Sequence, residues 1–454
     1  MTDHEAALDS EAWVGRLPVE VIAVADAVHA HPGPWLTAPV AAAACDQPER
    51  LVQQHLLVLC AGGTLLAEQG SRYRLAAARP LPPSSGESAV RRVVAWYLYA
   101  ADAAVRAMGR DIRRIALAAA APDPLPPAPD CFVAGYVWMQ QEQENLIAVT
   151  RAAFDHKLDQ AAWQLALMIA DTCTLDNDIA PWAEAVEVGR AAADRAEDLL
   201  GKALLVEVHG MLYSQRGLVG RAAALQHLAA ALREEIADPV ESARSANAFG
   251  LLCLRRGQMD DAVEHFRRAE NLAEEHSPRL AAIARGNAAT SLCLAGRFAE
   301  AETLLRASRE EMANLGMPLY AAGIGDDLSR ALRGQGRLEE ALDAARAGMA
   351  EIAALGVTSF LAAPLTEAAS TLAELGRSDE ALDHLRQAAV IYQSLRDRQR
   401  LAATFDQAAE LYREAGDHGQ AEALVDHAQA MRARLSDDDA ASDPNSDFEG
   451  STLA

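Results

Sequence analysis

Apolar positions in the first 80 residues follow helical spacing in three segments and strand-like spacing in two. The expected helices lie at 17–30, 35–45 and 48–59, and the expected strands lie at 64–66 and 73–75. Gly70 stands between the two strands, as is typical of a hairpin. Three helices followed by a hairpin predict a winged-helix domain over residues 1–80.

Beyond residue 200, a glycine recurs at a nearly constant spacing. The separations are 40, 39, 40, 40 and 40 residues, between Gly217, Gly257, Gly296, Gly336, Gly376 and Gly416. Small residues stand seven positions before and five positions after every one of these glycines. The pattern predicts repeated units, each made of a helix, a glycine turn and a second helix.

Two antiparallel helices can approach closely only where the facing side chains are small. The pattern resembles the tetratricopeptide repeat family over roughly residues 159–435. Its first unit is degenerate, because Asn177 replaces the turn glycine although Ala170, Trp182 and Gly189 keep the frame. A spacing near 40 exceeds the ~34 residues of the basic repeat, so we expect longer helices or longer loops. The predicted fold class is all-α, a tetratricopeptide-repeat superhelix with an N-terminal winged-helix domain.

Two proline-rich segments, at 80–86 and 122–129, cannot continue a helix and are predicted to be linkers. Residues 86–158 contain two amphipathic patterns and are expected to form a helical connector. Residues 436–454 carry six acidic and no basic side chains, which predicts a disordered acidic tail.

Composition limits the possible partners. The chain has 41 basic and 65 acidic residues and a formal charge of −24, so it repels nucleic acid and anionic membranes. The six cysteines form no C-x-x-C pair, which suits reduced thiols. The N-terminus has no apolar signal core, and no apolar stretch is long enough to span a bilayer. We expect a cytoplasmic protein without nucleic-acid or membrane partners.

Several short motifs follow one another in a distinctive order. They are Tyr73-Arg74-Leu75, the segment Trp96–Asp102, a proline-rich break, Trp138 with Glu142 and Asn145, and the segment Ala162–Ala166 that opens the repeats. This order resembles the C-terminal half of AfsR/SARP-type antibiotic-pathway regulators. That family places a nucleotide-binding NB-ARC domain, and often a DNA-binding domain, before this region, and we expect this chain to lack both. The pair Gly201-Lys202 does not fit a P-loop, so nucleotide hydrolysis is not expected.

A winged helix can bind DNA through its recognition helix, here residues 48–60. Residues 1–90 contain ten acids and five arginines, whereas DNA binding needs several cations on one face. We therefore expect a structural or protein-docking winged helix. A basic surface around Arg50, Arg72 and Arg74 would instead favour a DNA-binding transcription regulator with ligand-sensing repeats.

No residues have the spacing of a catalytic, cofactor or metal site. His29 and His31 lack further ligands at a suitable spacing, and Pro181 breaks the calcium-loop pattern that begins at Asp176. No catalytic residue, cofactor or metal is expected.

The first helices of the repeats are expected to line a concave groove. Helical spacing places five candidate ligand-binding residues there, namely Arg244, Asn247, Asp326, Arg330 and Arg333. Asparagine can pair with an extended peptide backbone, and arginine can bind carboxylates through two hydrogen bonds. Solvated arginines in this groove would suit an acidic ligand or an extended peptide.

These features favour a non-enzymatic regulatory or adaptor protein that binds a peptide or protein partner in its repeat groove. A biosynthetic enzyme that reuses the groove as an active site is a further alternative. It would show a deep pocket with perturbed carboxylates such as Asp326 or Asp406.

Overall fold

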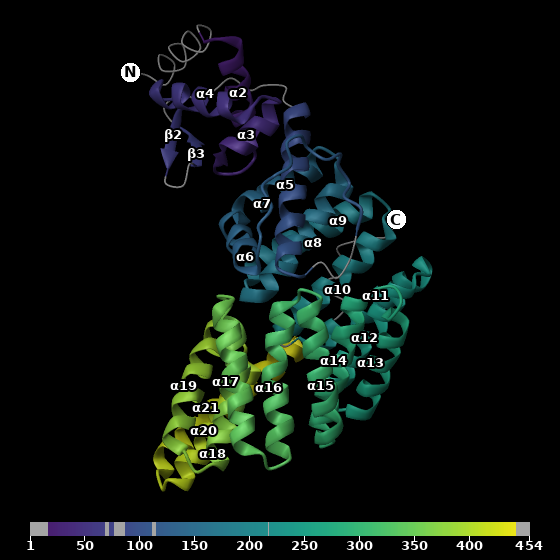
Figure 1. Ribbon diagram of the computed structural model, residues 1–454, viewed down its shortest axis with the longest axis vertical. Coiled ribbons are helices and arrows are strands. Elements are labelled where there is room, and N and C mark those ends of the chain that lie inside the picture. The colour runs from purple at the N-terminus through teal and green to yellow at the C-terminus, as the bar shows by residue number, and fades with distance from the viewer. Residues whose placement is uncertain (1–16, 69–71, 77–86, 111–114, 217, 442–454) are drawn as a thin grey trace. The chain divides into compact units, whose positions relative to one another are not determined.

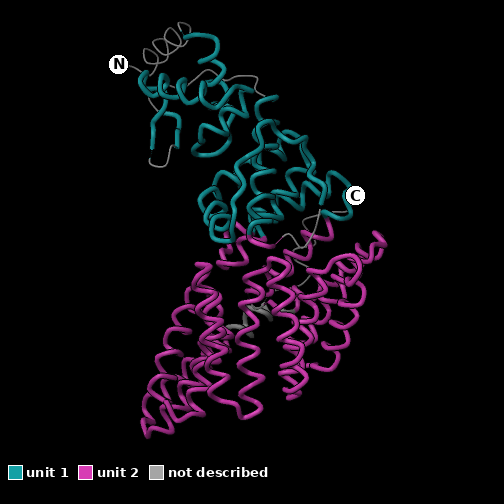
Figure 2. Tube along the Cα trace, in the orientation of Figure 1, with its two compact units in different colours: residues 1–107, 115–170, 183–201 teal, residues 108–114, 171–182, 202–454 magenta. Residues whose placement is uncertain are grey.

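The computed structural model describes residues 17–68, 72–76, 87–110, 115–216 and 218–441. The chain forms two compact units (Figure 2). Unit 1 comprises residues 1–107, 115–170 and 183–201, and unit 2 comprises residues 108–114, 171–182 and 202–454.

Within the described residues, unit 1 begins with three helices and a small sheet (Figure 1). The elements are α2 (Val19–Ala30), β1 (Leu36–Thr37), α3 (Ala38–Cys45), α4 (Glu49–Ala61), β2 (Leu65–Glu68) and β3 (Arg72–Leu75). Strand β3 is central and pairs antiparallel with both β1 and β2. Val24, Val52, Leu56 and Leu59 are fully buried in the core of this lobe. The short strand β1 was not predicted, because it lies inside the segment expected to be helical.

The rest of unit 1 is helical. It contains α5 (Glu87–Ala107), α6 (Phe132–Gln141), α7 (Gln143–Asp155), the first part of α8 (Asp159–Asp176) and most of α9 (Ile179–Arg195).

Buried polar contacts tie these helices to the N-terminal lobe. The Tyr97 hydroxyl donates to Glu142 (3.1 Å), and the Asn145 amide donates to the same carboxylate (2.6 Å). His31, which follows α2, contacts the Tyr97 hydroxyl through Nε2 at 3.3 Å. Burial lowers the pKa of His31 to about 4, so the ring is neutral. Glu142 and Asn145, which contributed to the family resemblance, thus join the start of α7 to α5 and, through Tyr97, to the end of α2.

Unit 2 consists of paired helices (Figure 1). The pairs after α8 and α9 are α10 (Leu199–Gln215) with α11 (Val219–Ile236), α12 (Pro239–Arg255) with α13 (Met259–Ala273), α14 (Pro278–Leu294) with α15 (Phe298–Asn314), α16 (Pro318–Gly334) with α17 (Leu338–Ala354), α18 (Ala362–Glu374) with α19 (Ser378–Ser394), and α20 (Arg398–Glu414) with α21 (His418–Ala441). A 3₁₀ helix, η1 (Thr358–Leu361), precedes α18.

The turns within the pairs confirm the glycine period. Gly257, Gly296, Gly336, Gly376 and Gly416 all have positive φ, between 73° and 82°. This left-handed conformation favours glycine because it has no Cβ. Asn177 adopts a φ of 53° at the degenerate first turn, and asparagine tolerates this region better than most residues. Gly217 lies outside the described residues.

Small residues allow the paired helices to approach closely. A Cβ on Gly250 would lie 2.6 Å from the Phe266 ring of the partner helix. A Cβ on Gly325 would lie 2.9 Å from the Cα of Gly348. The side chains at the predicted small positions, including Ala262, are fully buried or nearly so. The pairs therefore depend on missing side-chain volume at these positions.

The turn between α8 and α9 contacts a distant part of unit 2. The Asn177 amide donates to the carbonyl of Leu395, at a sequence separation of 218 residues. The Ser359 hydroxyl of η1 donates to the carbonyl of Leu175. The first helix pair is thus bonded to segments that flank the sixth pair.

The C-terminal helix α21 continues to Ala441, so the first residues of the predicted acidic tail are helical. Residues 442–454 lie outside the described residues. Within the described ranges, we find no helix with the length and apolar character needed to cross a lipid bilayer.

Enlarging a side chain at a small position should destabilise the repeat unit. We expect Ala262→Leu and Ala381→Leu each to lower the free energy of unfolding by about 1–3 kcal/mol, because both residues are fully buried between paired helices. Val390→Leu on α19 is a matched control, since Val390 is 67% exposed. Urea denaturation measures all three variants. Unchanged midpoints for both alanine variants would contradict the assigned repeat frame.

Candidate functional site

A network of charged and polar side chains joins the first helices of the fourth, fifth and sixth pairs. We call it the acidic cluster, and it comprises Thr290, Asp326, Asp327, Arg330, Arg333, Glu367 and Glu374. Four carboxylates thus stand beside two guanidinium groups. Three of the five residues predicted from the sequence, Asp326, Arg330 and Arg333, belong to it.

Both arginines in the acidic cluster are held by carboxylates. Arg330 donates to Asp327 (2.9 Å) and to Glu367 (2.9 Å). Arg333 donates to Glu367 (3.2 Å) and to Glu374 (2.8 Å). The sequence predicts these arginines to be solvated groups, whereas both are paired with carboxylates of the chain itself. Their carboxylate partners come from α16 itself, in Asp327, and from α18 of the next pair, in Glu367 and Glu374.

The pKa of Asp326 is raised above its ordinary value. Burial is the main cause, the neighbouring Asp327 adds to it, and together they raise the pKa of Asp326 to about 8. Burial also raises the pKa of Asp327, against the effect of Arg330. The pair formed by Asp326 and Asp327 therefore holds a proton to higher pH than an ordinary carboxylate does. A cation placed beside it would favour the charged carboxylate and release the proton.

Arg244, another predicted groove residue, belongs to a second cluster. The Arg233 side chain is 1% exposed and donates to Glu241 (2.9 Å) and to Glu207 (2.7 Å). Arg244 lies within 3.7 Å of Glu207 and 3.6 Å of Glu241. Two arginines and two glutamates thus balance each other between α10, α11 and α12. This arrangement has the character of a structural ion-pair cluster.

Asn247, the last predicted residue, makes a third and separate contact. Its side-chain oxygen accepts a hydrogen bond from the Asn287 amide (3.0 Å) on the next first helix. The structure therefore distributes the five predicted residues over three local contacts.

The partners of these residues were missed from the sequence, although a signal for them exists. Thr290 pairs with Asp327, and Arg330 with Glu367, each at a separation of 37 residues. Equivalent positions in adjacent units are 40 residues apart, and a partner one helical turn earlier in the next unit is therefore about 37 residues away. Residues on adjacent first helices face each other at this offset, so pairs of opposite charge could have been sought there.

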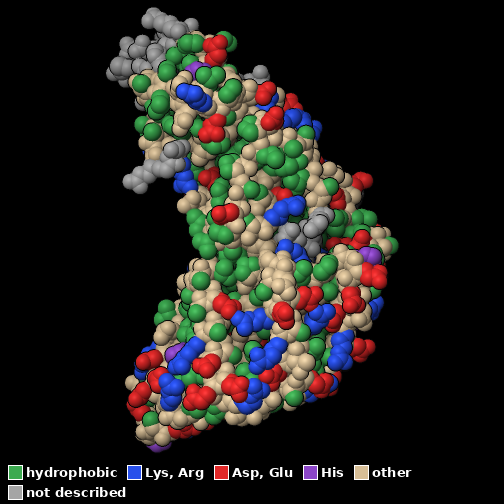
Figure 3. Space-filling model, in the orientation of Figure 1, with side chains coloured by type: hydrophobic (Ala, Val, Ile, Leu, Met, Phe, Trp, Pro, Cys, Tyr) green, Lys and Arg blue, Asp and Glu red, His purple; other side chains and the backbone are tan. Residues whose placement is uncertain are grey.

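Basic and acidic side chains are interspersed on the visible face of unit 2 (Figure 3). Unit 2 also contains further ion pairs, such as those of Arg337 with Glu302 (2.8 Å) and Glu340 (2.6 Å). This face carries charges of both signs.

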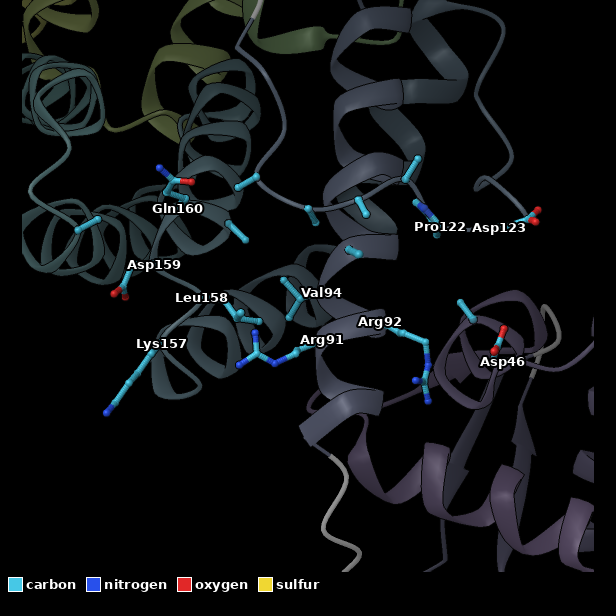
Figure 4. A pocket seen from close by; sticks show the side chains of 18 residues that line it. Asp46, Arg91, Arg92, Val94, Pro122, Asp123, Lys157, Leu158, Asp159 and Gln160 are labelled. Carbon is cyan, nitrogen blue, oxygen red and sulfur yellow. The ribbon is translucent and has the colours of Figure 1, made fainter.

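Unit 1 contains a pocket with a volume of about 730 Å³ (Figure 4). Eleven of its eighteen lining residues are apolar, and most of these are alanines. The Gln164 amide holds one wall by donating to the Ala116 carbonyl and accepting from the Ala118 amide, both at 3.0 Å. Lys157 extends away from the other labelled side chains in Figure 4. The volume suits a small molecule, but the predicted ligand-binding residues lie elsewhere.

The arginines expected on the hairpin are engaged within unit 1. Arg74 forms an ion pair with Glu68 on the neighbouring strand. Arg72 lies over the Trp35 ring at 4.8 Å and is 3.8 Å from Glu142. These contacts compete with any use of the two arginines for DNA phosphates.

Comparison with known proteins supports the repeat assignment. Residues 360–434 match the tetratricopeptide repeat family, so the C-terminal region contains tetratricopeptide repeats. No curated protein matches the chain.

One solved structure indicates the same kind of fold, and two others are similar to a lesser degree. A signal transduction ATPase with numerous domains (STAND) from Pyrococcus horikoshii, which has a tetratricopeptide repeat sensor, aligns with 94% of this chain at 11% identity and a TM-score of 0.55. The chain spans 59% of the length of that protein. A Rap protein complexed with competence and sporulation factor aligns with 67% of this chain and 98% of its own, at 12% identity and a TM-score of 0.47. Aspartyl phosphate phosphatase F from Bacillus subtilis aligns with 78% and 96%, at 14% identity and a TM-score of 0.47. At these identities the STAND comparison indicates a shared fold, and the other two scores do not establish one.

Removing the buried Arg233 should strongly destabilise unit 2. We expect Arg233→Ala to cost about 3–5 kcal/mol, because it removes the guanidinium that pairs with the largely buried Glu207 and Glu241. Arg91→Ala, which removes an exposed ion pair with Glu87, should change stability little. Chemical denaturation compares the two variants. Equal effects would contradict the structural role of the Arg233 cluster.

The raised pKa of Asp326 should make stability depend on pH. The folded chain keeps this proton up to about pH 8, whereas the unfolded chain loses it near the ordinary pKa of 3.8. The free energy of unfolding should therefore fall as pH rises between these values. Asp326→Asn should flatten this dependence and raise the melting temperature at pH 8.5.

Thermal unfolding between pH 5 and 8.5 measures this effect. Asp343→Asn on α17 is the control, because Asp343 is exposed and its removal should leave the slope unchanged. If the melting temperatures of the wild type and of Asp326→Asn changed with pH by the same amount, the inferred proton on Asp326 would be ruled out.

Proposed function

We propose that the chain is a cytoplasmic, non-enzymatic regulatory or adaptor protein whose repeat groove binds a peptide or protein partner. The tetratricopeptide match at residues 360–434 supports this role, because stacked repeats form extended binding surfaces. The acidic cluster lies on the first helices α14, α16 and α18, which are expected to line such a groove.

The charge balance of the acidic cluster favours a basic partner. Its two arginines are paired, so the groove offers little free positive charge to an acidic ligand. Asp326, by contrast, has a raised pKa and would gain a partner from a bound lysine or arginine. An extended segment with one or two basic side chains is therefore the ligand class that we propose. This single observation, the excess of carboxylates over arginines, carries the assignment.

The N-terminal lobe fits a docking role better than DNA binding. We interpret its three helices and three-stranded sheet as a winged helix, with residues 86–158 as a connector and 159–435 as the repeat array. The exposed side of α4 carries the apolar residues Leu51, Leu57 and Val58. Such residues suit contact with protein rather than with phosphates.

We also propose that the chain corresponds to the sensor half of an AfsR/SARP-type regulator. The likeness to a STAND protein with a tetratricopeptide repeat sensor supports this, since it covers 94% of the chain. In this proposal, ligand binding to the repeats is the sensing event.

Catalysis is the rival function, and the raised pKa of Asp326 is the observation that favours it. Asp326 does not line the 730 Å³ pocket, which lies in unit 1. A binding role for Asp326 therefore remains our conclusion.

A peptide selection tests the proposal. Phage-displayed random dodecapeptides panned on the full chain should be enriched in lysine and arginine. Asp326→Asn should weaken binding of a selected peptide roughly tenfold or more, since a lost charged hydrogen bond costs about 1.5–3 kcal/mol. Asp343→Asn should bind that peptide as the wild type does.

Calorimetry in two buffers of different ionisation enthalpy should also detect proton release by the wild type at pH 7, and none by Asp326→Asn. Enrichment of acidic peptides, or equal binding by Asp326→Asn, would refute the basic-ligand assignment.

A further inference from the structure

A short segment after α5 packs against the repeats although it belongs to none of them. The described residues of this segment, Met108–Arg110, group with unit 2, and Met108 is buried. The carbonyl of Gly109 accepts a hydrogen bond from Arg279 (3.0 Å) in the first turn of α14. Gly109 has a φ of 65°, and a Cβ on it would lie 2.0 Å from the carbonyl oxygen of Gly316. Only glycine fits this close approach between two backbones.

Arg110 provides the polar anchor of this segment. Its guanidinium donates to both carboxylate oxygens of Asp171, each at 2.8 Å, and to the Thr174 hydroxyl at 3.0 Å. It also lies over the ring of Tyr320, 5.8 Å from the ring centre. The Arg110 side chain is 8% exposed. A paired, stacked and buried guanidinium is a specific mode of arginine recognition.

The residues that receive Arg110 come from helices far apart in the sequence. Asp171 and Thr174 lie at the end of α8, and Tyr320 lies in the first turn of α16. We call this set, with Arg279 and Gly316, the arginine site. It combines a backbone hydrogen bond, a close contact that admits only glycine, and a charged side-chain anchor. Main-chain hydrogen bonds combined with a side-chain anchor are general means of peptide recognition.

We propose that the arginine site is a receptor for a peptide turn with a Gly-Arg pair, which the chain's own Met108–Arg110 segment fills and a partner segment can displace. The internal segment is covalently attached, so it competes at an effective concentration of order millimolar. A partner would therefore bind tightly only when the internal segment is released. The arginine site shares no residue with the acidic cluster, so this proposal does not depend on the proposed function.

Two variants of the full chain should open the site by different routes. Arg110→Ala removes the anchor, and Gly109→Val prevents the close approach to Gly316 without changing any charge. The probe is a synthetic peptide of residues 104–112. Both variants should bind it at least about tenfold more tightly than the wild type does, as measured by fluorescence anisotropy. The same peptide with alanine in place of Arg110 should not bind.

Arg106→Ala is the matched control in both the chain and the peptide. Arg106 precedes Arg110 by one helical turn, is exposed and pairs with Asp102 (2.7 Å). It should have no effect on binding. Asp171→Asn combined with Gly109→Val should abolish peptide binding.

Hydrogen exchange on the wild-type chain tests whether a peptide displaces the internal segment, even if the variants do not fold. A millimolar excess of the arginine peptide should accelerate amide exchange at residues 108–110, whereas the alanine peptide should not. Unchanged exchange in the wild type would overturn the proposal, as would folded Arg110→Ala and Gly109→Val chains that do not bind the peptide. Arg110 would then be a permanent structural anchor.

Discussion

The close approach of paired helices is the constraint on which the repeat unit depends. Where Gly250 meets Phe266, or Gly325 meets Gly348, there is no room for another methyl group. Close packing within pairs brings successive first helices into register. That register aligns Thr290 with Asp327, and Arg330 with Glu367. The polar clusters between first helices therefore depend on the small residues that let the helices within each pair pack closely.

The same reasoning explains what could be predicted from the sequence. The turn glycines and small positions are local features with a fixed period, so the helix pairs followed from spacing alone. Asn177 was recognised as a substitute turn residue for the same reason, and its positive φ agrees. The pairing of Arg330 was not foreseen, because a helical face shows where a side chain points but not what faces it. Arg110 was missed because its partners lie 61 to 210 residues away in the sequence.

Arginine dominates the basic residues of this acidic chain, with Lys157 and Lys202 as the two lysines. A guanidinium can bridge two carboxylates at once, as Arg233 and Arg330 both do. Lysine, as a compact point charge, suits this bridging geometry less well. One arginine can thus hold two acidic side chains from different helices. The chain can therefore pack its helices closely although it has more acidic than basic residues.

The bond from Asn177 to Leu395 has a consequence for how the array unfolds. A solenoid with contacts only between neighbours resembles a one-dimensional chain, and its terminal repeats can fray independently. Here the first turn is fastened to segments around the sixth pair. Loss of the early repeats therefore also removes a contact of the late ones. We therefore expect the first and the last repeats to unfold together rather than independently.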